Sequence, residues 1–124
     1  MAWTVTFDDD FEVEFKDLVA DVQDALLATT RLLQDYGPQL GRPHVDTLSG
    51  SKHANMKELR FEAADGEWRA AFAFDPRREG ILLVASDKAG VSQRRFYTQL
   101  IAKADKRYDA HLQKLKTAAT KTER

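Results

Sequence analysis

Residues 57–85 read KELRFEAADGEWRAAFAFDPRREGILLVA and contain three β-strand patterns separated by two turn signals. Polar and apolar residues alternate over 57–64 and again over 67–75, which is the period of a half-buried strand. Asp65-Gly66 predicts a tight turn between these strands, because glycine tolerates the positive φ that such a turn requires. The run 81–85 is apolar on both faces and predicts a central strand. We therefore predict an antiparallel β-meander.

The segments on either side of the meander predict one more strand and three helices. Residues 3–7 alternate and are rich in β-forming residues, so they predict a short first strand. Apolar spacing predicts helices over 11–18 and 21–36, and a last helix that begins after Ser92 as its N-cap. The segment 37–55 has little periodicity and is interpreted as a long surface loop. The order β-α-α-β-β-β-α predicts an α+β domain with its helices on one face of the sheet.

The length of 124 residues fits one domain, which we place at 1–116, with a frayed tail over 117–124. The chain has no cysteine, which excludes disulfides and thiolate metal sites. Its three histidines lack the spacing of metal ligands, so neither a metal nor another cofactor is expected. No apolar run approaches the roughly 18–20 residues of a membrane span, and no secretory signal is recognisable. We expect a cytoplasmic protein without a membrane partner.

Charge is distributed unevenly along the chain. Residues 1–50 carry ten acidic and three basic side chains, whereas residues 51–124 carry ten acidic and sixteen basic ones. Such a division favours an anionic partner for the C-terminal half. It would equally allow the two halves to attract each other within one fold, and composition leaves both interpretations open.

Two arginines are predicted to share one face of the meander. A turn at Asp65-Gly66 places Arg60 and Arg69 diagonally on that face with Glu62 between them, and small alanines beside them leave room for an anion. The alternative is that Arg69 pairs with Glu62 across the strands, which would contribute about 0.2–1 kcal/mol. The residues alone are compatible with an anion site and with a structural ion pair.

Other candidate residues lie near the ends of the predicted elements. Lys88 follows the last strand of the meander, where loop residues are often functional, although a solvated lysine in a turn is the alternative. Arginines at the start of a helix oppose its dipole and can be retained for binding. The remaining candidates are a pair in the predicted loop and three residues at the start of the last helix: Lys52, His53, Arg94, Arg95 and Tyr97.

Several short motifs occur together in a familiar order: GPxLGRP at 37–43, KELRF at 57–61, WRAAFAFDP at 68–76 and ILLVxxDKxG at 81–90. With Phe96-Tyr97 and the later Tyr108, this series resembles the RelE/ParE superfamily of bacterial toxins, and most of all its HigB-like (host-inhibition-of-growth) branch. The resemblance covers residues 3–115. The chain lacks the lysine-rich stretch of many HigB toxins and has DKAGVS at 87–92 in its place.

The resemblance implies a RelE-like fold and the toxin of a type II toxin–antitoxin system, with a cognate antitoxin that often carries a helix-turn-helix domain. Ribonuclease members cleave translated mRNA, usually in the ribosomal A site, by attack of a ribose 2′-OH on the adjacent phosphate without a metal. By this resemblance Arg60 and Arg69 would hold the phosphate, and Lys88 would stabilise charge or act as general base. We expect the RNA-binding residues to be Lys52, His53, Arg94, Arg95 and Tyr97. The alternatives are a ParE-like inhibitor of DNA gyrase and a non-catalytic antitoxin-binding module.

Overall fold

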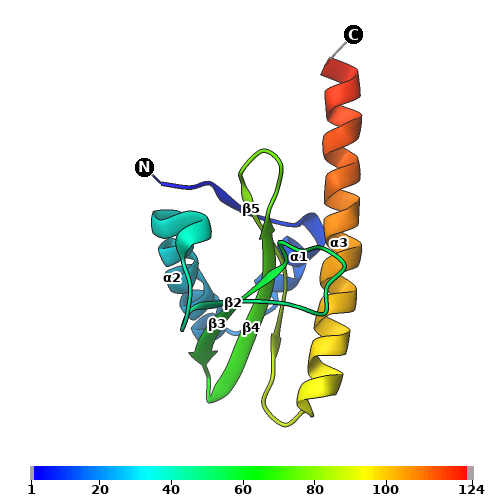
Figure 1. Cartoon of the computed structure of the whole chain (residues 1–124). Coiled ribbons are helices and arrows are strands. Elements are labelled where there is room, and N and C mark those ends of the chain that lie inside the picture. The colour runs from blue at the N-terminus through cyan, green and yellow to red at the C-terminus, as the bar shows by residue number, and fades with distance from the viewer. Residues whose placement is uncertain (1, 123–124) are drawn as a thin grey trace.

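A five-stranded sheet forms the centre of the molecule, in the order β1-β5-β4-β3-β2 (Figure 1). The computed structural model describes residues 2–122. The predicted meander consists of β3 (Lys57–Ala63), β4 (Gly66–Phe74) and β5 (Gly80–Asp87), which pair antiparallel. Because β5 lies between β1 and β4, the prediction of a central strand is confirmed. The α+β class and the predicted order of the helices and longer strands are confirmed as well.

Two short strands complete the sheet at its edges. β1 (Val5–Phe7) runs parallel to β5, so the sheet is mixed. β2 (Val45–Thr47) pairs antiparallel with β3 and lies inside the segment that was interpreted as a loop. A single turn of 3-10 helix, η1 (Gly37–Gln39), lies in the same segment. β1 was predicted because it lies in an alternating stretch of β-forming residues, whereas β2 was missed because its three residues lie in a segment with little periodicity.

The turn between β3 and β4 lies one residue earlier than predicted. Ala63 pairs with Gly66, so the two turn residues are Ala64 and Asp65, and both have positive φ values of 49° and 60°. The prediction of a turn at Asp65-Gly66 is therefore wrong. The observed register brings Arg60 directly opposite Arg69 instead of diagonal to it.

Gly66 leaves room at the start of β4 for the side chain of Asp87. A Cβ at this position would lie 2.6 Å from a carboxylate oxygen of Asp87. That carboxylate accepts the backbone N–H groups of Glu67 at 3.1 Å and Ala89 at 2.9 Å. The absence of a side chain thus allows Asp87 to fix the end of β5 against the start of β4.

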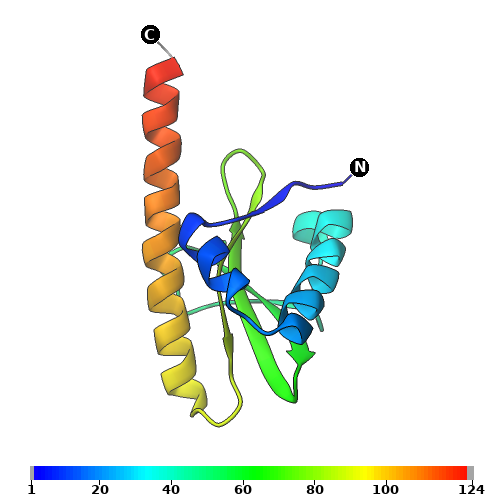
Figure 2. The same ribbon diagram turned by 180° about the vertical axis from the view of Figure 1, so that it is seen from behind.

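Helices α1 (Asp9–Lys16) and α2 (Ala20–Tyr36) cover one face of the sheet (Figure 2). Asp8 caps α1, because its carboxylate accepts the N–H groups of Asp10 at 3.0 Å and Phe11 at 3.1 Å. α2 ends at Gly37, where φ is 61°, as the sequence predicts. The core on this side includes Phe11, Val22, Leu26, Leu33, Leu59, Phe61, Phe72 and Leu82.

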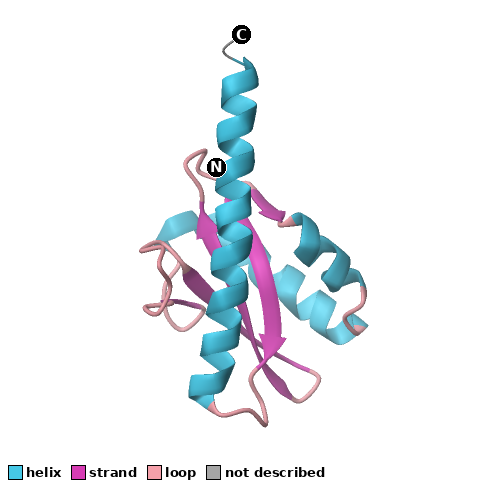
Figure 3. Ribbon diagram, turned by 90° about the vertical axis from the view of Figure 1, so that its right-hand side faces the viewer, coloured by secondary structure: helices cyan, strands magenta, loops and turns pink. Residues whose placement is uncertain are grey.

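Helix α3 (Gln93–Thr122) packs on the opposite face of the sheet, so the prediction that all helices lie on one face is wrong (Figures 1 and 3). The reason lies in the alanines of β4. Ala71 and Ala73 are fully buried beneath α3, and their small side chains make room for a helix rather than for an anion. The core on this side includes Leu48, Met56, Ala71, Ala73, Ile81, Leu83, Val84, Phe96, Leu100, Ala104 and Tyr108.

The start of α3 agrees with the sequence, because the hydroxyl of Ser92 accepts the N–H of Arg95 at 3.3 Å as an N-cap does. The last turns of α3 extend beyond the sheet (Figure 3). Residues 117–122, within the predicted frayed tail, are helical, and residues 123–124 lie outside the described part of the chain. None of the helices between residues 2 and 122 is sufficiently long and apolar to cross a membrane.

Arg107 joins α3 to α1 through a set of hydrogen bonds. Its guanidinium donates to both carboxylate oxygens of Glu14, at 2.8 and 2.5 Å, and to the carbonyl oxygen of Leu83 at 2.8 Å. The hydrogen bond with Glu14 raises the pKa of Arg107 and lowers that of Glu14. This contact fixes the middle of α3 over the sheet.

Candidate functional site

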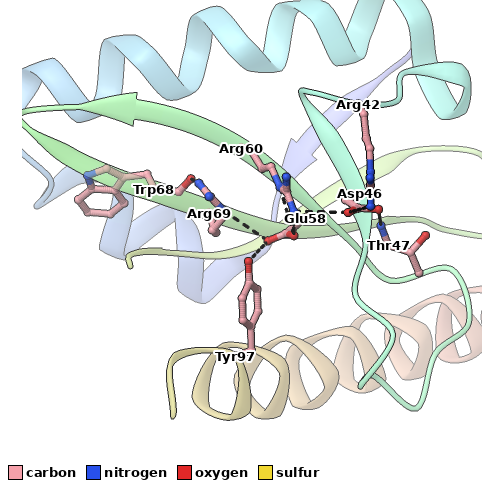
Figure 4. A network of polar contacts seen from close by, with 8 residues as sticks. All are labelled: Arg42, Asp46, Thr47, Glu58, Arg60, Trp68, Arg69 and Tyr97. Carbon is pink, nitrogen blue, oxygen red and sulfur yellow. Dashed lines mark hydrogen bonds and ion pairs between the residues drawn. The ribbon is translucent and has the colours of Figure 1, made fainter. Parts of the chain in front are cut away.

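The paired arginines of β3 and β4 lie on the face of the sheet that α3 covers (Figure 4). The carboxylate between them belongs to Glu58, which is only 3% exposed. Its Oε2 accepts Nη2 of Arg60 at 3.1 Å and Nε of Arg60 at 3.3 Å, and its Oε1 lies 3.6 Å from Nε of Arg69. Glu62, which was predicted to lie between the arginines, is exposed and faces Glu67 across the strands.

Tyr97 closes this cluster from the side of α3. Its hydroxyl donates a hydrogen bond of 2.7 Å to Oε1 of Glu58 (Figure 4). Burial raises the pKa of Tyr97, and the hydrogen bond and charge of Glu58 raise it further. The phenol therefore keeps its proton at neutral pH. We call Glu58, Arg60, Arg69 and Tyr97 the arginine–glutamate cluster.

The two arginines of the cluster differ in exposure. The side chain of Arg69 is only 11% exposed and donates from Nη1 to the carbonyl oxygen of Trp68 at 2.9 Å. Its buried Nε has no hydrogen-bond partner among the described residues. The side chain of Arg60 is 36% exposed and lies 3.4 Å from Oδ2 of Asp46 on β2. Arg60 is thus the arginine of the cluster that solvent or a ligand can reach.

Charges around Arg60 keep it protonated. Burial acts to lower its pKa, but the hydrogen bond and charge of Glu58 outweigh that effect, and the pKa is raised. Asp46 also pairs with Arg42 at 2.8 Å, and this hydrogen bond lowers the pKa of Asp46. β2, which the sequence did not predict, thereby supplies a second carboxylate beside Arg60 (Figure 4).

A cavity of about 870 Å³ lies between α3, β3 and the segment that follows β2. Glu58, Arg60 and Tyr97 are among the residues that line it, so three members of the cluster face a single open space. The rest of its wall consists of Thr47, Leu48, Ser49, Gly50, Gln93, Arg94, Thr98, Ile101 and Ala102.

Comparison with known proteins places this chain in a family. The model of the family described as phage derived protein Gp49-like (DUF891) matches residues 13–109. The chain belongs to the Gp49-like family. It is 42% identical to the putative toxin HigB2 of Mycobacterium tuberculosis over 93 residues, which are 74% of this chain and 46% of that protein. It is 47% identical to the putative toxin HigB3 of the same organism over 88 residues, which are 68% of this chain and 75% of that protein.

The fold of this Gp49-like chain is shared with a solved toxin. A double arginine-to-alanine variant of the Escherichia coli toxin RelE in its free state superimposes with a TM-score of 0.61 at 17% identity. The match covers 86% of this chain and 98% of that chain. Together with the sequence relatives, it confirms the resemblance to the HigB-like branch of the RelE/ParE superfamily. The chain spans less than half the length of HigB2.

Lys88 of the Gp49-like chain is half-buried at the end of β5. Its backbone N–H donates to the carbonyl oxygen of Glu67 at 2.7 Å, so the pairing of β5 with β4 continues to this residue. Arg69 pairs with Ser86, two residues before Lys88, and Lys88 does not line the cavity. The structure thus brings the two arginines together and places Lys88 outside the lining of the cavity.

The candidates at the start of α3 fall on different surfaces. Arg94 and Arg95 are both exposed in the first turn. Arg94 lines the cavity beside Tyr97, whereas Arg95 does not. Arg94 and Tyr97 therefore join the arginines at one site.

Lys52 and His53 are engaged by α3. Lys52 forms an ion pair with Asp109, and Nε2 of His53 lies at hydrogen-bond distance, 2.8 Å, from Oδ1 of the same carboxylate. Ser51 and the backbone N–H of Lys52 hold Asp105, one turn earlier on the helix. These contacts attach the segment 51–53 to α3, away from the cavity lining.

Glu58 and Asp46 are the site residues that the sequence did not point out. A signal for Glu58 is present, because it alternates with Leu59 and so shares the face of Arg60. Its importance depends on the register of β3 and β4 and on the position of α3, neither of which is readable from a local pattern.

Proposed function

We propose that this protein is the toxin of a type II toxin–antitoxin system and acts in the cytoplasm as a metal-independent endoribonuclease on translated mRNA. The observation that carries this proposal is the shared cavity, in which Arg60, Glu58 and Tyr97 face one space with Arg69 directly behind them. A cleavable phosphate needs cations for its developing charge, a base and a proton donor. The cavity offers one group of each kind.

The proposed reaction begins with the 2′-OH of a ribose. The Glu58 carboxylate accepts the proton of this hydroxyl as its oxygen forms a bond to the adjacent phosphorus. Arg60, supported by Arg69, stabilises the charge that grows on the phosphate oxygens. The bond from phosphorus to the 5′-oxygen then breaks, and Tyr97 supplies the proton that this oxygen takes up. The products are a 2′,3′-cyclic phosphate and a 5′-hydroxyl end.

The other expected residues have supporting roles in the proposal. Arg94 lines the cavity and is placed to contact the RNA backbone or a base. Lys88 and Arg95 lie outside the lining, so we assign them contacts with more distant phosphates. Since phosphate binding releases counterions, raising the salt concentration is expected to weaken RNA binding by the purified protein.

The cognate antitoxin is the proposed protein partner. The two HigB relatives are named as toxins, and the resemblance to the superfamily implies a small antitoxin, often with a helix-turn-helix domain. Co-purification of the chain with the product of a neighbouring reading frame tests this partner. Restored growth on co-expression is the expected result.

Arg60→Ala provides the main test of nuclease action. This side chain is the more exposed of the two arginines, so its removal is tolerated by the fold better than that of Arg69. Loss of a preorganised cation is expected to reduce the cleavage rate by about 100-fold or more. Mapping of cleaved 5′ ends in translated transcripts measures this. Arg31→Ala, an exposed position on α2, is the matched control. Unchanged cleavage and growth arrest by Arg60→Ala would overturn the assignment.

A toxin without nuclease chemistry is the second candidate, and one observation favours it. Both guanidinium groups are already engaged by a carboxylate of the chain itself, as expected for a structural ion-pair network. A structural ion-pair network of this kind fits either a ParE-like inhibitor of DNA gyrase or a non-catalytic antitoxin-binding module. DNA damage without transcript cleavage would identify the gyrase inhibitor, and expression without any growth defect would identify the binding module.

A further inference from the structure

A carboxylate at the edge of the sheet lies between two arginines. Oδ2 of Asp46 is 2.8 Å from Nη2 of Arg42 and 3.4 Å from Nη2 of Arg60 (Figure 4). One anionic oxygen thus has a guanidinium group on either side of it, and phosphate oxygens accept hydrogen bonds from guanidinium groups in the same way. Arg42 belongs to the motif GPxLGRP at 37–43, and the proposed reaction gives this residue no role.

Main-chain contacts bring the two arginines to this place. The N–H of Val45 donates to the carbonyl oxygen of Gly41 at 3.0 Å, which closes a turn around Arg42. The N–H of Arg60 donates to the carbonyl oxygen of His44 at 2.8 Å, so β3 runs beside this turn. These bonds involve only the backbone, and they therefore remain when the carboxylate between the two arginines moves.

The carboxylate of Asp46 is weakly held for a structural ion pair. Asp46 lies directly opposite Glu58 across β2 and β3, and like charges in that arrangement destabilise a strand pair. Nη2 of Arg60 is closer to Glu58, at 3.1 Å, than to Asp46. The side chain of Arg42 is 77% exposed and that of Asp46 is 26% exposed, so solvent screens their pair and it contributes little to stability. An external anion can therefore replace Asp46 at little cost.

We propose that Asp46 occupies the position of an RNA phosphate, which displaces this carboxylate and binds between Arg42 and Arg60. The inference rests on the proposed function for its ligand class, RNA. Glu58 holds Arg60 in place through two hydrogen bonds while both arginines exchange Asp46 for the phosphate oxygens. Arg42 is thus a phosphate-binding residue at the edge of the site. Asp46 weakens RNA binding because it competes with the phosphate for the two arginines.

Four variants test the exchange. Asp46→Asn keeps the shape of the side chain and removes the competing charge. Glu62→Gln is its matched control, because it removes an exposed carboxylate from β3 that faces Glu67. Arg42→Ala removes the exposed cation and is made both in the wild type and in the Asp46→Asn background. Arg31→Ala, at an exposed position on α2, is the control for loss of an arginine. Thermal unfolding verifies that each variant is folded.

The probe is a fluorescent RNA hexanucleotide with 2′-O-methyl riboses, which cannot be cleaved by 2′-OH attack. Fluorescence anisotropy measures its dissociation constant with the full-length protein at several salt concentrations. We expect Asp46→Asn to bind the probe about fivefold more tightly than the wild type. Glu62→Gln and Arg31→Ala should change the affinity less than about twofold.

The effect of Arg42→Ala should depend on the residue at position 46. In the Asp46→Asn background we expect this change to weaken binding about tenfold, because the phosphate loses a charged donor. It should also lower the number of counterions released on binding by about 0.7, as for the loss of one phosphate contact to single-stranded RNA. In the wild type the loss of affinity should be smaller, since Arg42 must leave Asp46 before it meets the phosphate.

Several results would overturn this inference. Unchanged or weaker binding by Asp46→Asn would identify Asp46 as a support for the arginines instead of a competitor. Equal effects of Arg42→Ala in the two backgrounds, an unchanged salt dependence, or no binding of the probe by the wild type and Asp46→Asn would overturn it as well.

The test is separate from the nuclease assay because the probe resists cleavage. A wild type that shows the expected binding pattern but cuts no transcript would contradict the proposed reaction and leave the phosphate position standing. Transcript cleavage by a wild type whose RNA affinity is indifferent to Asp46→Asn would remove the phosphate position and leave the reaction standing.

Discussion

Two of the polar clusters that attach α3 to the rest of the molecule differ in how completely their members are paired. Around Arg107, both Nη atoms have acceptors, and the side chain is only 11% exposed. In the arginine–glutamate cluster, Nε of Arg69 lacks a hydrogen bond within the described chain, Arg60 is partly exposed, and a cavity adjoins the group. The Arg107 contacts are therefore those of a structural ion pair, whereas the arginine–glutamate cluster keeps hydrogen-bond donors that a ligand can use.

Arg107→Ala should have the largest effect on stability. It removes the charge-assisted bonds to Glu14 and leaves the buried carbonyl of Leu83 without its donor. We expect the free energy of unfolding to fall by about 3 kcal/mol in urea denaturation. Arg31→Ala at an exposed position should stay within about 0.5 kcal/mol of the wild type. Equal effects of the two variants would show that the Arg107 contact does not hold α3.

Glu58→Gln in the arginine–glutamate cluster should lower the stability of the fold while raising its affinity for RNA. The neutral amide preserves the shape of the side chain but loses the charge that pairs both arginines, so unfolding should cost about 1.5 kcal/mol less. The same change releases the arginines for an external anion, and the affinity for single-stranded RNA with 2′-O-methyl riboses, which cannot be cleaved by 2′-OH attack, should rise several-fold. Glu62→Gln, exposed on the same face, is the control and should change affinity less than about twofold. Weaker RNA binding by Glu58→Gln would contradict this account.

Tyr97→Phe should have a smaller effect on stability. It removes one buried hydrogen bond to Glu58, which is worth about 1 kcal/mol. Tyr36→Phe changes a tyrosine that is 58% exposed and should leave the free energy of unfolding unchanged. Thermal unfolding measures the loss of stability in each variant. An equal loss in both would rule out a contribution from the hydrogen bond between Tyr97 and Glu58.

The smallest expected effect is a change with pH in the difference in unfolding free energy between the wild type and Arg107→Ala. Arg107 lowers the pKa of Glu14 below its ordinary value of 4.5 in the folded state. The resulting stabilisation is complete above that value and disappears as the pH falls through the lower folded pKa. The stability difference between the two proteins should therefore narrow below about pH 4.5. A difference that stays constant down to pH 2 would contradict the assignment of this shift to Arg107.

The sequence predicted the longer strands and all three helices, because each carries enough residues for a period to appear. The alternation also predicted that Arg60 and Arg69 share one face. Moving the turn by one residue changes which residues are paired but leaves both arginines on that face. The direct opposition of these residues did not follow, because Asp65-Gly66 carries a strong turn signal while Gly66 is needed for its contact with Asp87. That requirement comes from a residue twenty-one positions away.

The candidate site was predicted less completely than the fold. Ala71 and Ala73 were interpreted as space for an anion, whereas they allow α3 to approach the sheet. Only with α3 in place does Tyr97 meet Glu58, and only with β2 in place does Asp46 approach Arg60. These contacts join elements far apart in the chain, and no local pattern encodes them.

The carboxylate of Asp87 above Gly66 has a consequence for genetic screens. We expect a side chain at position 66 to displace this carboxylate and so to weaken its hydrogen bonds with the backbone N–H groups of Glu67 and Ala89. A selection for harmless alleles should therefore recover changes at Gly66 or Asp87 in which both arginines are intact. In such alleles the protein would be inactivated by a change where β4 begins and β5 ends, outside the proposed substrate site.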